Sequence, residues 1–422
     1  MRFLKLLCCI ILLAGKSWGG APLDKRFFGF HGHELFSSAA AFNVGFGSIR
    51  LWDTGTSWRD VEPEKGRFDF SRLDEFVRIA GKNDLKVTLT LGSTPQWASL
   101  RKNESCAYGQ GCAAPPADIE DWKNYVATVV SRYKGRIECY ESWNEVSFPS
   151  EPALLYKVGG GNPMFYSGTI AQLVDLQKVV YEQVKAIDPK ACVLSPSFHS
   201  TGDWVRKADL FMKAGGGRYF DNLSFHLYFG DWPERMVPVI ARLRAALDHY
   251  GLKASRIYNT EVGIPFDQYQ NRARSQAVLS GHSSGDPANI GAALILRTYL
   301  TNAAFGVDRV YWYAWDDGVF GMEKPDAFSR DGEKRVFGQV VKLLEGQTID
   351  GCAKESGDRY WTCRLHSAAG KMAVYWTDPH AERAQFKIPA TARSAYLFGR
   401  EGGQLPAGSS LMLGFEPVVV RF

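Results

Sequence analysis

Short apolar runs separated by amphipathic stretches fill the first three quarters of the chain. Eight runs with strand-like character recur at helix-sized intervals: Phe27–His31, Ser48–Trp52, Lys86–Gly92, Ile137–Asn144, Cys192–Phe198, Asn222–Tyr228, Arg256–Glu261 and Arg309–Trp315. Apolar positions with helical spacing lie between several of them, in Leu73–Lys82, Ile119–Tyr133, Ile170–Ile187, Val237–Tyr250 and Ile290–Ala304. A strand followed by a helix, repeated eight times, predicts a (β/α)8 TIM barrel.

A doubly wound open sheet is the alternative α/β fold for this pattern. Its first strand would be followed by a glycine-rich phosphate-binding turn. The first run instead continues as Gly29-Phe30-His31-Gly32-His33, which lacks that pattern. The strand starts are also almost continuously apolar, as expected where both faces of a parallel sheet are covered. We therefore expect the barrel.

The helical pattern ends near Leu344. From Thr348 onward, short alternating strands with turn signals follow, in Tyr360–Leu365, Met372–Trp376, Ala384–Ile388, Ser394–Phe398 and Pro417–Phe422. They predict a small antiparallel β domain. We thus expect a signal peptide at 1–21, a catalytic barrel at 22–346 and a β-sandwich-like domain at 347–422. The aromatic residues of the last domain suit a core or a glycan-binding face, and we favour a structural role.

The first residues are typical of a secretory signal peptide. Arg2 and Lys5 precede an apolar run, Leu6–Ala14, and Ser17-Trp18-Gly19 offers a small-residue exit. The run is too short to span a bilayer, although a retained membrane anchor is the alternative. No later segment is long and apolar enough to span one. We expect an exported protein, secreted or periplasmic, with the signal peptide removed.

Composition and charge exclude some classes of protein. Hydrophobic residues make up 45% of the chain and charged residues 23%, which argues against wholesale disorder. Removing the signal peptide lowers the formal charge from +5 to +2, because three basic and no acidic residues lie in it. No run of Lys and Arg interleaved with aromatic residues remains. A nucleic-acid partner is therefore not expected, and the oligomeric state stays open.

Six cysteines lie beyond the signal peptide. Cys106 and Cys112 close a small loop, and Cys352 and Cys363 bracket a predicted hairpin, so each pair predicts a local disulfide in an exported protein. The other two, Cys139 and Cys192, fall in neighbouring strands and could be bridged or remain buried thiols. Zinc-ligand spacing is absent, and we expect neither a metal nor a cofactor.

Two glutamates stand at the ends of different predicted barrel strands, Glu145 after the fourth run and Glu261 at the end of the seventh. Catalytic residues of a TIM barrel come from these strand ends. Two facing carboxylates are what glycoside hydrolysis requires, about 5–5.5 Å apart for retention and roughly 6.5–9.5 Å for inversion. A single glutamate at a strand end is usually a solvated residue. Two in matching positions, with Asn144 before one of them, predict catalysis.

The motifs around these glutamates resemble those of retaining glycoside hydrolases. Trp143-Asn144-Glu145 on the fourth strand, with Glu261 ending the seventh, resembles clan A, and the wider sequence is similar to family 39-type enzymes. The similarity covers about residues 26–320 and includes Ile49–Asp53, Trp58, Glu62–Gly66, Phe68-Asp69, Leu91–Ala98, Tyr133–Ile137 and Phe225–Tyr228. That group contains β-xylosidase-like enzymes and bacterial exopolysaccharide-associated endoglycosidases. Tyr133–Arg136 is closer to the latter.

The resemblance implies roles for the residues at the strand ends. Glu145 would be the general acid/base with a raised pKa, and Glu261 the ionised nucleophile. Arg50 would keep Glu261 ionised, and Asn144 would hydrogen-bond the sugar 2-hydroxyl. Further substrate-contacting or orienting roles are implied for His226, Tyr228 and Trp315, with Trp97 and Trp52 as candidates for sugar stacking.

Other carboxylates near the predicted site have weaker claims. Glu141 lies on the same strand and face as Glu145 but deeper, and we expect it to be the buried partner of a basic residue such as Arg50. Four further acidic residues fall near loop mouths, where exposure is expected: Asp53, Glu62, Asp316 and Asp317.

Two loops depart from the family pattern, Asn103–Pro116 with its cysteine pair and the glycine-rich Pro149–Gly168. Both are expected to border the cleft and to decide which polysaccharide or oligosaccharide fits. We expect an endo-acting enzyme on a bacterial exopolysaccharide. The alternatives are an exo-acting β-xylosidase-like enzyme and a catalytically silent glycan-binding protein. A barrel enzyme with metal or phosphate chemistry would lack both its ligands and its phosphate loop.

Overall fold

The structure is a computed structural model that describes residues 20–33, 44–148, 150, 164–199, 203–229, 232–264, 287–316, 330–355, 359–377, 384–400 and 402–422. The predicted signal peptide up to residue 19, most of the predicted loop 149–168 and Asp317 lie outside the described residues. None of the helices in the described ranges is long and apolar enough to cross a membrane.

Eight parallel strands form the central sheet: β1 (Phe28–Phe30), β2 (Ser48–Leu51), β3 (Lys86–Thr90), β6 (Cys139–Glu141), β7 (Cys192–Leu194), β8 (Leu223–His226), β9 (Ile257–Val262) and β10 (Val307–Trp312). Their order is β7-β6-β3-β2-β1-β10-β9-β8. Parallel bridges from Leu194 to Asn222 and from Phe198 to Phe225 join the two end strands. The sheet is therefore closed, and the predicted TIM barrel is confirmed, with one strand in each predicted run.

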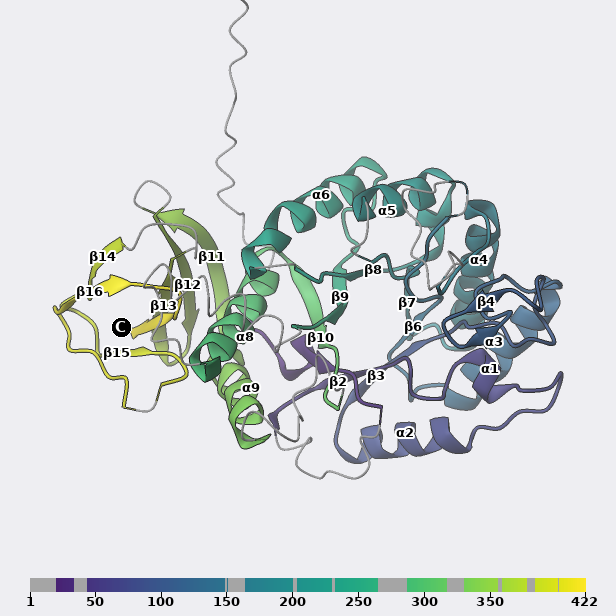
Figure 1. The fold of residues 1–422 in the computed structure, drawn as a ribbon, viewed down its shortest axis with the longest axis horizontal. Helices are drawn as coiled ribbons and strands as arrows, with labels where there is room; N and C mark the ends of the chain where they lie inside the picture. Colours follow the sequence, from purple (N-terminus) through teal and green to yellow (C-terminus); the bar gives the residue numbers. More distant parts are fainter. Residues whose placement is uncertain are drawn as a thin grey trace, which may run out of the picture.

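Helices surround this barrel (Figure 1). Five were predicted, with ends that differ by three residues at most: α2 (Ser71–Lys82), α3 (Ile119–Tyr133), α4 (Ile170–Ile187), α6 (Met236–His249) and α8 (Pro287–Ala304). Three more were not delimited from the sequence, namely α1 (Trp58–Val61), α5 (Trp204–Lys213) and α9 (Arg330–Leu344). Local sequence helps to set the start of α4, because Thr169 and Gln172 form a reciprocal capping box there.

The C-terminal part is an antiparallel β domain, as predicted. Its larger sheet contains β11 (Thr348–Glu355), β12 (Tyr360–Ser367), β13 (Gly370–Trp376), β17 (Val418–Arg421) and β15 (Ser394–Leu397), in that order. A second sheet pairs β14 (Ala384–Lys387) with β16 (Ser410–Leu413). Apolar side chains fill the space between the sheets, among them Phe386, Ile388, Leu413, Val418 and Val420. The sequence pattern did not delimit β11 and β16, whose exposed and buried positions do not alternate strictly.

The β domain shares its core with the barrel. Trp361, Val374 and Trp376 belong to the same hydrophobic cluster as the barrel helices. Between the two parts, the fully buried guanidinium of Arg297 on α8 pairs with Glu234 at 2.6 Å, and Trp376 Nε1–H donates to the same carboxylate at 2.8 Å. Glu234 lies in a short 3-10 helix, η7 (Pro233–Arg235). This continuity favours a structural role for the β domain.

All three cysteine pairs are disulfide-bonded. Cys106–Cys112 and Cys352–Cys363 are the local bridges expected from the sequence. The third bridge, between Cys139 and Cys192, settles a question that the sequence left open. Its cysteines lie opposite each other in the β6–β7 register, which brings the two sulfur atoms together. Three bridges are typical of proteins from an oxidising compartment.

Candidate active site

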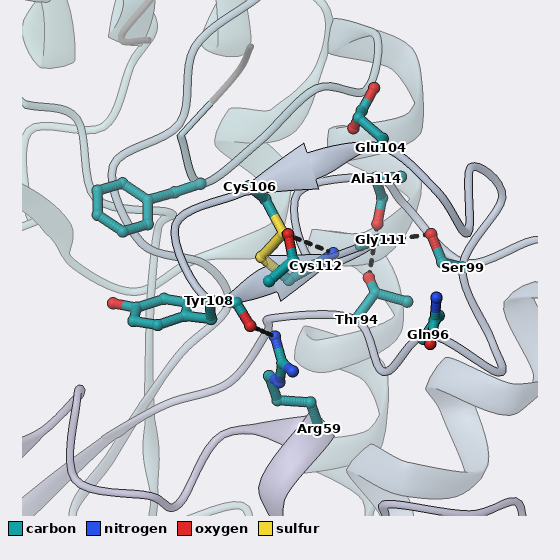
Figure 2. The surroundings of a disulfide bond; sticks show 12 residues. Arg59, Thr94, Gln96, Ser99, Glu104, Cys106, Tyr108, Gly111, Cys112 and Ala114 are labelled. Atoms are coloured by element: carbon teal, nitrogen blue, oxygen red, sulfur yellow. Dashed lines mark hydrogen bonds between the residues drawn. A yellow bond between two sulfur atoms is a disulfide. The ribbon is translucent and has the colours of Figure 1, made fainter. Parts of the chain in front are cut away.

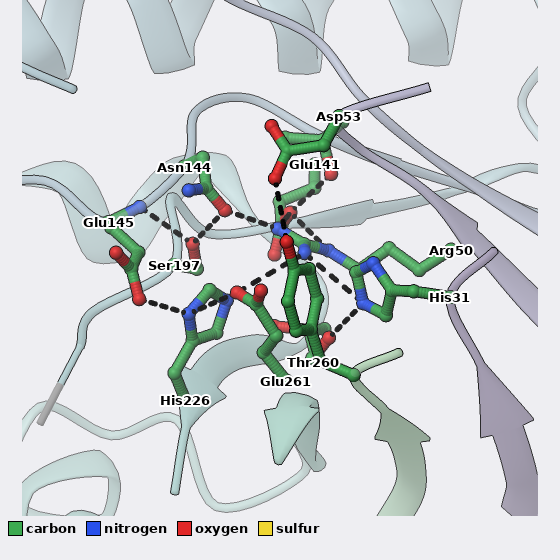
Figure 3. A network of polar contacts seen from close by, with 12 residues as sticks. His31, Arg50, Asp53, Glu141, Asn144, Glu145, Ser197, His226, Thr260 and Glu261 are labelled. Atoms are coloured by element: carbon green, nitrogen blue, oxygen red, sulfur yellow. Dashed lines mark hydrogen bonds and ion pairs between the residues drawn. The ribbon is translucent and has the colours of Figure 1, made fainter. Parts of the chain in front are cut away.

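Glu145 and Glu261 lie at the same end of the barrel, one just beyond β6 and the other near the end of β9. Figure 3 shows His226, from the end of β8, between them. Glu145 adopts a left-handed backbone with φ of 45°, and its N–H donates to Ser197 Oγ at 2.9 Å. Asp53 and Ser93, beyond β2 and β3, are also left-handed. Such strain costs on the order of 1–3 kcal/mol for each residue and tends to gather at functional sites.

The two glutamates are close enough to act on one sugar. His226 Nδ1 lies 2.8 Å from Oε1 of Glu145 and 2.7 Å from Oε2 of Glu261. One carboxylate oxygen of each glutamate and a ring nitrogen of His226 all lie within 4.8 Å of one another. Oxygen atoms this close are compatible with the roughly 5–5.5 Å between the carboxyl groups of retaining glycosidases.

Arg50 contacts several of the polar side chains that surround the two glutamates. Its Nε–H donates to Glu141 Oε2 at 2.9 Å, and its Nη2–H donates to Asn144 Oδ1 at 2.7 Å. Its Nη1 lies 3.7 Å from Glu261 Oε2. Arg50 and Glu141 are completely buried, and Glu141 also accepts a hydrogen bond from Thr90 Oγ1 at 2.6 Å. Glu141 is thus the buried partner of Arg50, as the sequence predicted.

Burial dominates the protonation of the pair. It raises the pKa of Glu261 to about 7, against the charge of Arg50 and a hydrogen bond from the Tyr228 hydroxyl, which both lower it. Burial also raises the pKa of Glu145, against a hydrogen bond from His226. The sequence analysis expected Arg50 to keep Glu261 ionised, and the pKa of about 7 shows that Arg50 does so only in part. The desolvation of Glu261 outweighs the nearby guanidinium.

The remaining predicted residues either surround the two glutamates or pack against other aromatic rings. Asn144 and Tyr228 join His226 around the glutamates. In Asn144, Arg50 binds the amide oxygen, so the amide nitrogen is the donor left for a ligand. Trp315 is only 2% exposed, and its ring packs edge-on against Phe30 and Phe46.

The two stacking candidates lie in different surroundings. Trp97 is half-buried, donates from Nε1 to the carbonyl of Glu62 at 2.9 Å and contacts Trp58 rather than the glutamates. Trp52 is buried, and its ring lies edge-on to those of Tyr108 and Phe165.

The expectation that the loop-mouth acids are exposed was wrong for three of them. Glu62 is 1% exposed and accepts from Trp58 Nε1 at 2.8 Å. Asp316 contacts His33 Nδ1 at 2.9 Å and is largely buried. Asp53 accepts hydrogen bonds from Tyr108 and, at 3.2 Å, from Tyr313. Partners distant in sequence cover Asp53 and Asp316, which the local pattern could not reveal, whereas the partners of Glu62 lie four residues away on either side.

Tyr108 is a site residue that the sequence analysis missed. It lies between the disulfide-bonded Cys106 and Cys112, in a hairpin formed by β4 (Ser105–Cys106) and β5 (Gly109–Gln110), and Arg59 donates to its carbonyl (Figure 2). Because the bridge fixes the hairpin, the tyrosine hydroxyl is held against Asp53. The cysteine pair was the signal that could have identified this loop as part of the site.

The same constellation also meets the geometric requirement for a metal site. Glu145, His226 and Glu261 offer three ligand atoms within 4.8 Å, a set that could hold a metal ion. Sequence spacing gave no hint of this, because the three residues come from separate strands. A metal bound there would occupy both carboxylates, so metal binding and double displacement at this site exclude each other.

Comparisons with known proteins point to glycoside hydrolases. A family model described as beta-galactosidase, glycoside hydrolase family 42, matches residues 48–111. Endo-1,4-beta-xylanase 2 of Claviceps purpurea is 24% identical over 203 residues, 46% of this chain, and the chain spans only 56% of that relative.

Solved structures resemble the chain over almost its whole length. A monomeric beta-xylosidase from Caulobacter crescentus CB15 has a TM-score of 0.62 at 15% identity, covering 96% of this chain and 97% of its own. The GH39 enzyme from Xanthomonas axonopodis pv. citri has a TM-score of 0.60 at 16% identity, covering 96% and 95%. At these identities the likeness is one of fold. With the family match and the xylanase relative, it confirms the predicted resemblance to glycoside hydrolases of clan A.

Proposed function

We propose that this chain is an exported, retaining glycoside hydrolase that cleaves a polysaccharide by double displacement on Glu145 and Glu261. The observation that carries the proposal is the placement of both carboxylates within 4.8 Å around His226 at the carboxyl end of a barrel. No step of the reaction requires a metal or cofactor.

In the first step, Glu145 donates its proton to the glycosidic oxygen. A carboxylate oxygen of Glu261 forms a bond to the anomeric carbon as the bond to the leaving group breaks. In the second step, Glu145 takes a proton from water, the water oxygen bonds to the anomeric carbon, and the electron pair of the ester bond returns to Glu261. The amide nitrogen of Asn144 would donate to the sugar 2-hydroxyl.

The surroundings of the two glutamates support this division of roles. Glu261 forms an ion pair with the Arg50 guanidinium and accepts a hydrogen bond from the Tyr228 hydroxyl. Both contacts favour its ionised form. Glu145 has no cationic guanidinium or ammonium within 4.0 Å among the described residues, and burial favours its protonated form. In the free protein burial favours a proton on either glutamate, and the proposal assigns that proton to Glu145 once substrate is bound.

The substrate is proposed to be a bacterial exopolysaccharide cleaved internally. Export is supported by the three disulfides, and the partly exposed rings of Tyr108 and Phe165 beside the site suit a chain of sugars. An exo-acting, β-xylosidase-like enzyme is the alternative. The likeness in fold to a beta-xylosidase favours it.

Trapping of the covalent intermediate tests the mechanism. Wild type and Glu261→Gln would be treated with a panel of activated 2-fluoro glycosides, prepared as mono- and oligosaccharides, and their intact masses measured. A mass gain of one glycosyl unit in wild type alone supports double displacement on Glu261 and identifies the accepted sugar. No adduct with any donor, together with glycan binding by calorimetry, would instead indicate a silent binding protein.

Product analysis separates the two modes of cleavage. An endo enzyme shortens a long polysaccharide with a rapid fall in viscosity and leaves aryl monoglycosides intact. Release of terminal sugars alone, with rapid hydrolysis of an aryl monoglycoside, would favour exo action.

A further inference from the structure

Asp53 is a carboxylate at the carboxyl end of the barrel that the proposed mechanism does not use. It lies two residues beyond β2 and is partly exposed. Its Oδ1 accepts a hydrogen bond from the Tyr108 hydroxyl, and its Oδ2 accepts one from the Tyr313 hydroxyl at 3.2 Å. The two tyrosines belong to the loops that follow β3 and β10. Three loops of the barrel therefore meet at this carboxylate.

Direct contacts connect Asp53 with the surroundings of Glu261. The backbone N–H of Tyr313 donates to the carbonyl of Val262 at 2.8 Å, and Val262 is the residue that follows Glu261. Figure 3 shows the Asp53 carboxylate directed towards the group that contains Arg50 and Glu261. A ligand group bound to Asp53 would therefore belong to the reacting sugar or to a sugar next to it.

The negative charge of Asp53 is not balanced by a neighbouring cation in the part of the chain that the structure describes. Its hydrogen-bond partners there are two neutral hydroxyls, and no Lys, Arg or His nitrogen lies within 4.0 Å of it. His33 belongs to the same network, with Nε2 3.4 Å from the Tyr313 hydroxyl, but its Nδ1 contacts Asp316 at 2.9 Å. Any charge on His33 is therefore balanced by Asp316. Carboxylates that are removed from water are usually paired, so a cationic ligand would complete this site.

The hydrogen-bonding capacity that remains at Asp53 suits donors. An ionised carboxylate has about four acceptor positions and no donor, and the tyrosine hydroxyls use only part of them. Burial and the charge of Asp53 raise the pKa of Tyr108, so its hydroxyl keeps its proton and donates it to Asp53. Burial raises the pKa of Asp53 as well, and hydrogen bonds from both tyrosines oppose this by favouring the ionised form. A ligand must therefore supply donors.

Aromatic rings lie beside the same carboxylate. The ring of Tyr108 is edge-on to that of Trp52, with 5.7 Å between centroids, and lies 5.9 Å from that of Phe165. Tyr108 and Phe165 are partly exposed. Aromatic faces attract cations and also pack against apolar surfaces, such as one face of a sugar ring. The rings and the carboxylate together suit a sugar that carries a positive charge.

Common sugar substituents differ in how well they match these surroundings. An ammonium group offers several donors, no acceptor and a positive charge. A hydroxyl offers a single donor without charge. An N-acetyl group has an N–H donor but is neutral and bulkier. The carboxylate of a uronic acid is a negatively charged acceptor, which Asp53 would repel. The ammonium group is the best match in both charge and hydrogen bonding.

We propose that Asp53, held by Tyr108 and Tyr313, binds the ammonium group of an N-unsubstituted amino sugar, and that the substrate is a polysaccharide containing such sugars. The inference rests on the proposed function and names its substrate class. The carboxylate accepts the ammonium protons in charge-assisted hydrogen bonds, which are stronger than those of a neutral donor. Acetylation of the amine removes both the charge and the preference.

Binding of small sugars tests this proposal without hydrolysis. Ligand-observed NMR at low ionic strength gives dissociation constants for glucosamine, galactosamine and mannosamine, for the parent hexoses and for the N-acetyl derivatives. Wild type should bind at least one amine about 10-fold more tightly than its parent hexose and its N-acetyl derivative. The Asp53→Asn variant should lose this preference. Asp84→Asn, at an exposed carboxylate, is the matched control and should keep it.

Two results would overturn the proposal: no preference for any amine in wild type, or a preference that survives in folded Asp53→Asn. If Asp53→Asn does not fold, chemical coupling in wild type decides. A water-soluble carbodiimide activates a carboxylate, the amine of the bound sugar attacks it, and an amide forms as the urea leaves. Peptide mass spectrometry should locate that amide on Asp53. Amides on other carboxylates alone would refute the assignment.

Activity measurements separate this inference from the proposed function. If wild type hydrolyses a neutral glycan and shows no preference for amines, the substrate class is wrong and the hydrolase stands. If wild type hydrolyses no glycan but binds an amine through Asp53, the proposed hydrolysis fails and the binding site stands.

Discussion

The Nδ1 atom of His226 lies 2.8 Å from Oε1 of Glu145. The same nitrogen lies 2.7 Å from Glu261, so a single ring N–H faces two carboxylates. Burial lowers the pKa of His226, which leaves a neutral ring with one proton to donate at this atom. This single N–H cannot donate a full hydrogen bond to two ionised carboxylates at once. The arrangement therefore favours one additional proton on the glutamate pair, which is the state that an acid and a nucleophile require.

The first prediction concerns stability as a function of pH. Burial raises the pKa of Glu261 from an ordinary 4.5 to about 7, so the folded protein binds a proton there that the unfolded chain releases. The unfavourable effect on folding grows as pH rises from about 4.5 to about 7 and is complete above that. The Glu261→Gln substitution removes this unfavourable effect on folding. We expect the melting temperature of the variant to exceed that of wild type above pH 7.

Thermal melts across this pH range provide the check. The difference in melting temperature should shrink as pH falls towards 4.5 and vanish below it, where Glu261 becomes neutral in both states. Glu64→Gln, at an exposed carboxylate, should show no such trend. A constant difference at every pH would show that the glutamine acts through packing rather than through charge.

The second prediction concerns the acid/base. Glu145→Ala should lower kcat/KM by about 10²–10⁴-fold on substrates with poor leaving groups, because these need a proton in the first step. Substrates with activated leaving groups should still form the covalent intermediate but release it slowly. Added azide should restore turnover by attacking the intermediate without base assistance.

The product of that rescue distinguishes the two glutamates. A β-glycosyl azide from a β-glycoside with Glu145→Ala would place Glu145 on the side of water attack. If the rescued product instead had inverted configuration, the roles of Glu145 and Glu261 would have to be exchanged.

The third prediction concerns the buried ion pair next to the two glutamates. Arg50 and Glu141 form a completely buried ion pair, and removing one partner leaves an uncompensated charge. We expect Glu141→Ala to reduce the free energy of unfolding by about 3–5 kcal/mol. The exposed pair of Arg78 and Glu75 is the control, where Glu75→Ala should cost less than about 1 kcal/mol. Urea unfolding measures the free energy of unfolding of both variants. Equal losses would contradict the larger contribution expected of the buried pair.

The sequence predicted the barrel and the glutamate pair because both follow from local rules. Strand and helix periodicities set the elements, and a barrel brings its strand ends together wherever they lie in the chain. The pairing of Glu141 with a basic residue was also predictable. A carboxylate inside an apolar strand must find a cation, and Arg50 lies on β2, on the far side of β3 and two residues lower in the register.

The parts that escaped prediction depend on contacts between distant segments. Asp53 looked exposed because its partner Tyr108 lies 55 residues away, on a loop whose path is set by a disulfide. The sequence analysis did not single out Lys207, because helical spacing alone does not show that its ammonium reaches His199. Whether the ring of Trp315 packs or is presented to a ligand depends on Phe30 and Phe46, near the other end of the barrel sequence.

The fourth prediction tests the disulfide-bonded loop. Tyr108→Phe removes the hydroxyl that binds Asp53 but keeps the ring between Trp52 and Phe165. We expect a several-fold rise in KM on long substrates with kcat nearly unchanged. The free energy of unfolding should fall by about 1.5–3 kcal/mol, because one hydrogen bond to a charged group contributes about that much. A similar rise in Tyr125→Phe, whose hydroxyl is buried away from the glutamates, would contradict a local effect.

The fifth prediction concerns the contact between barrel and β domain. The Arg297 guanidinium is completely buried between Glu234 and the rings of Trp232, Trp376 and Phe415. Arg297→Met leaves the Glu234 carboxylate buried without its cation, and we expect a loss of about 3–5 kcal/mol in the free energy of unfolding.

The double variant Arg297→Met with Glu234→Gln shows whether that loss comes from the stranded charge. Because the glutamine is neutral and can still accept from Trp376 Nε1, it should recover part of the loss. Both variants should unfold in one transition followed by tryptophan fluorescence, since barrel and β domain share one hydrophobic cluster. Two separate transitions in wild type would show instead that the β domain is an independent module. In that case, its removal should leave a folded barrel, and a glycan-binding role for the domain would become the better explanation of its aromatic residues.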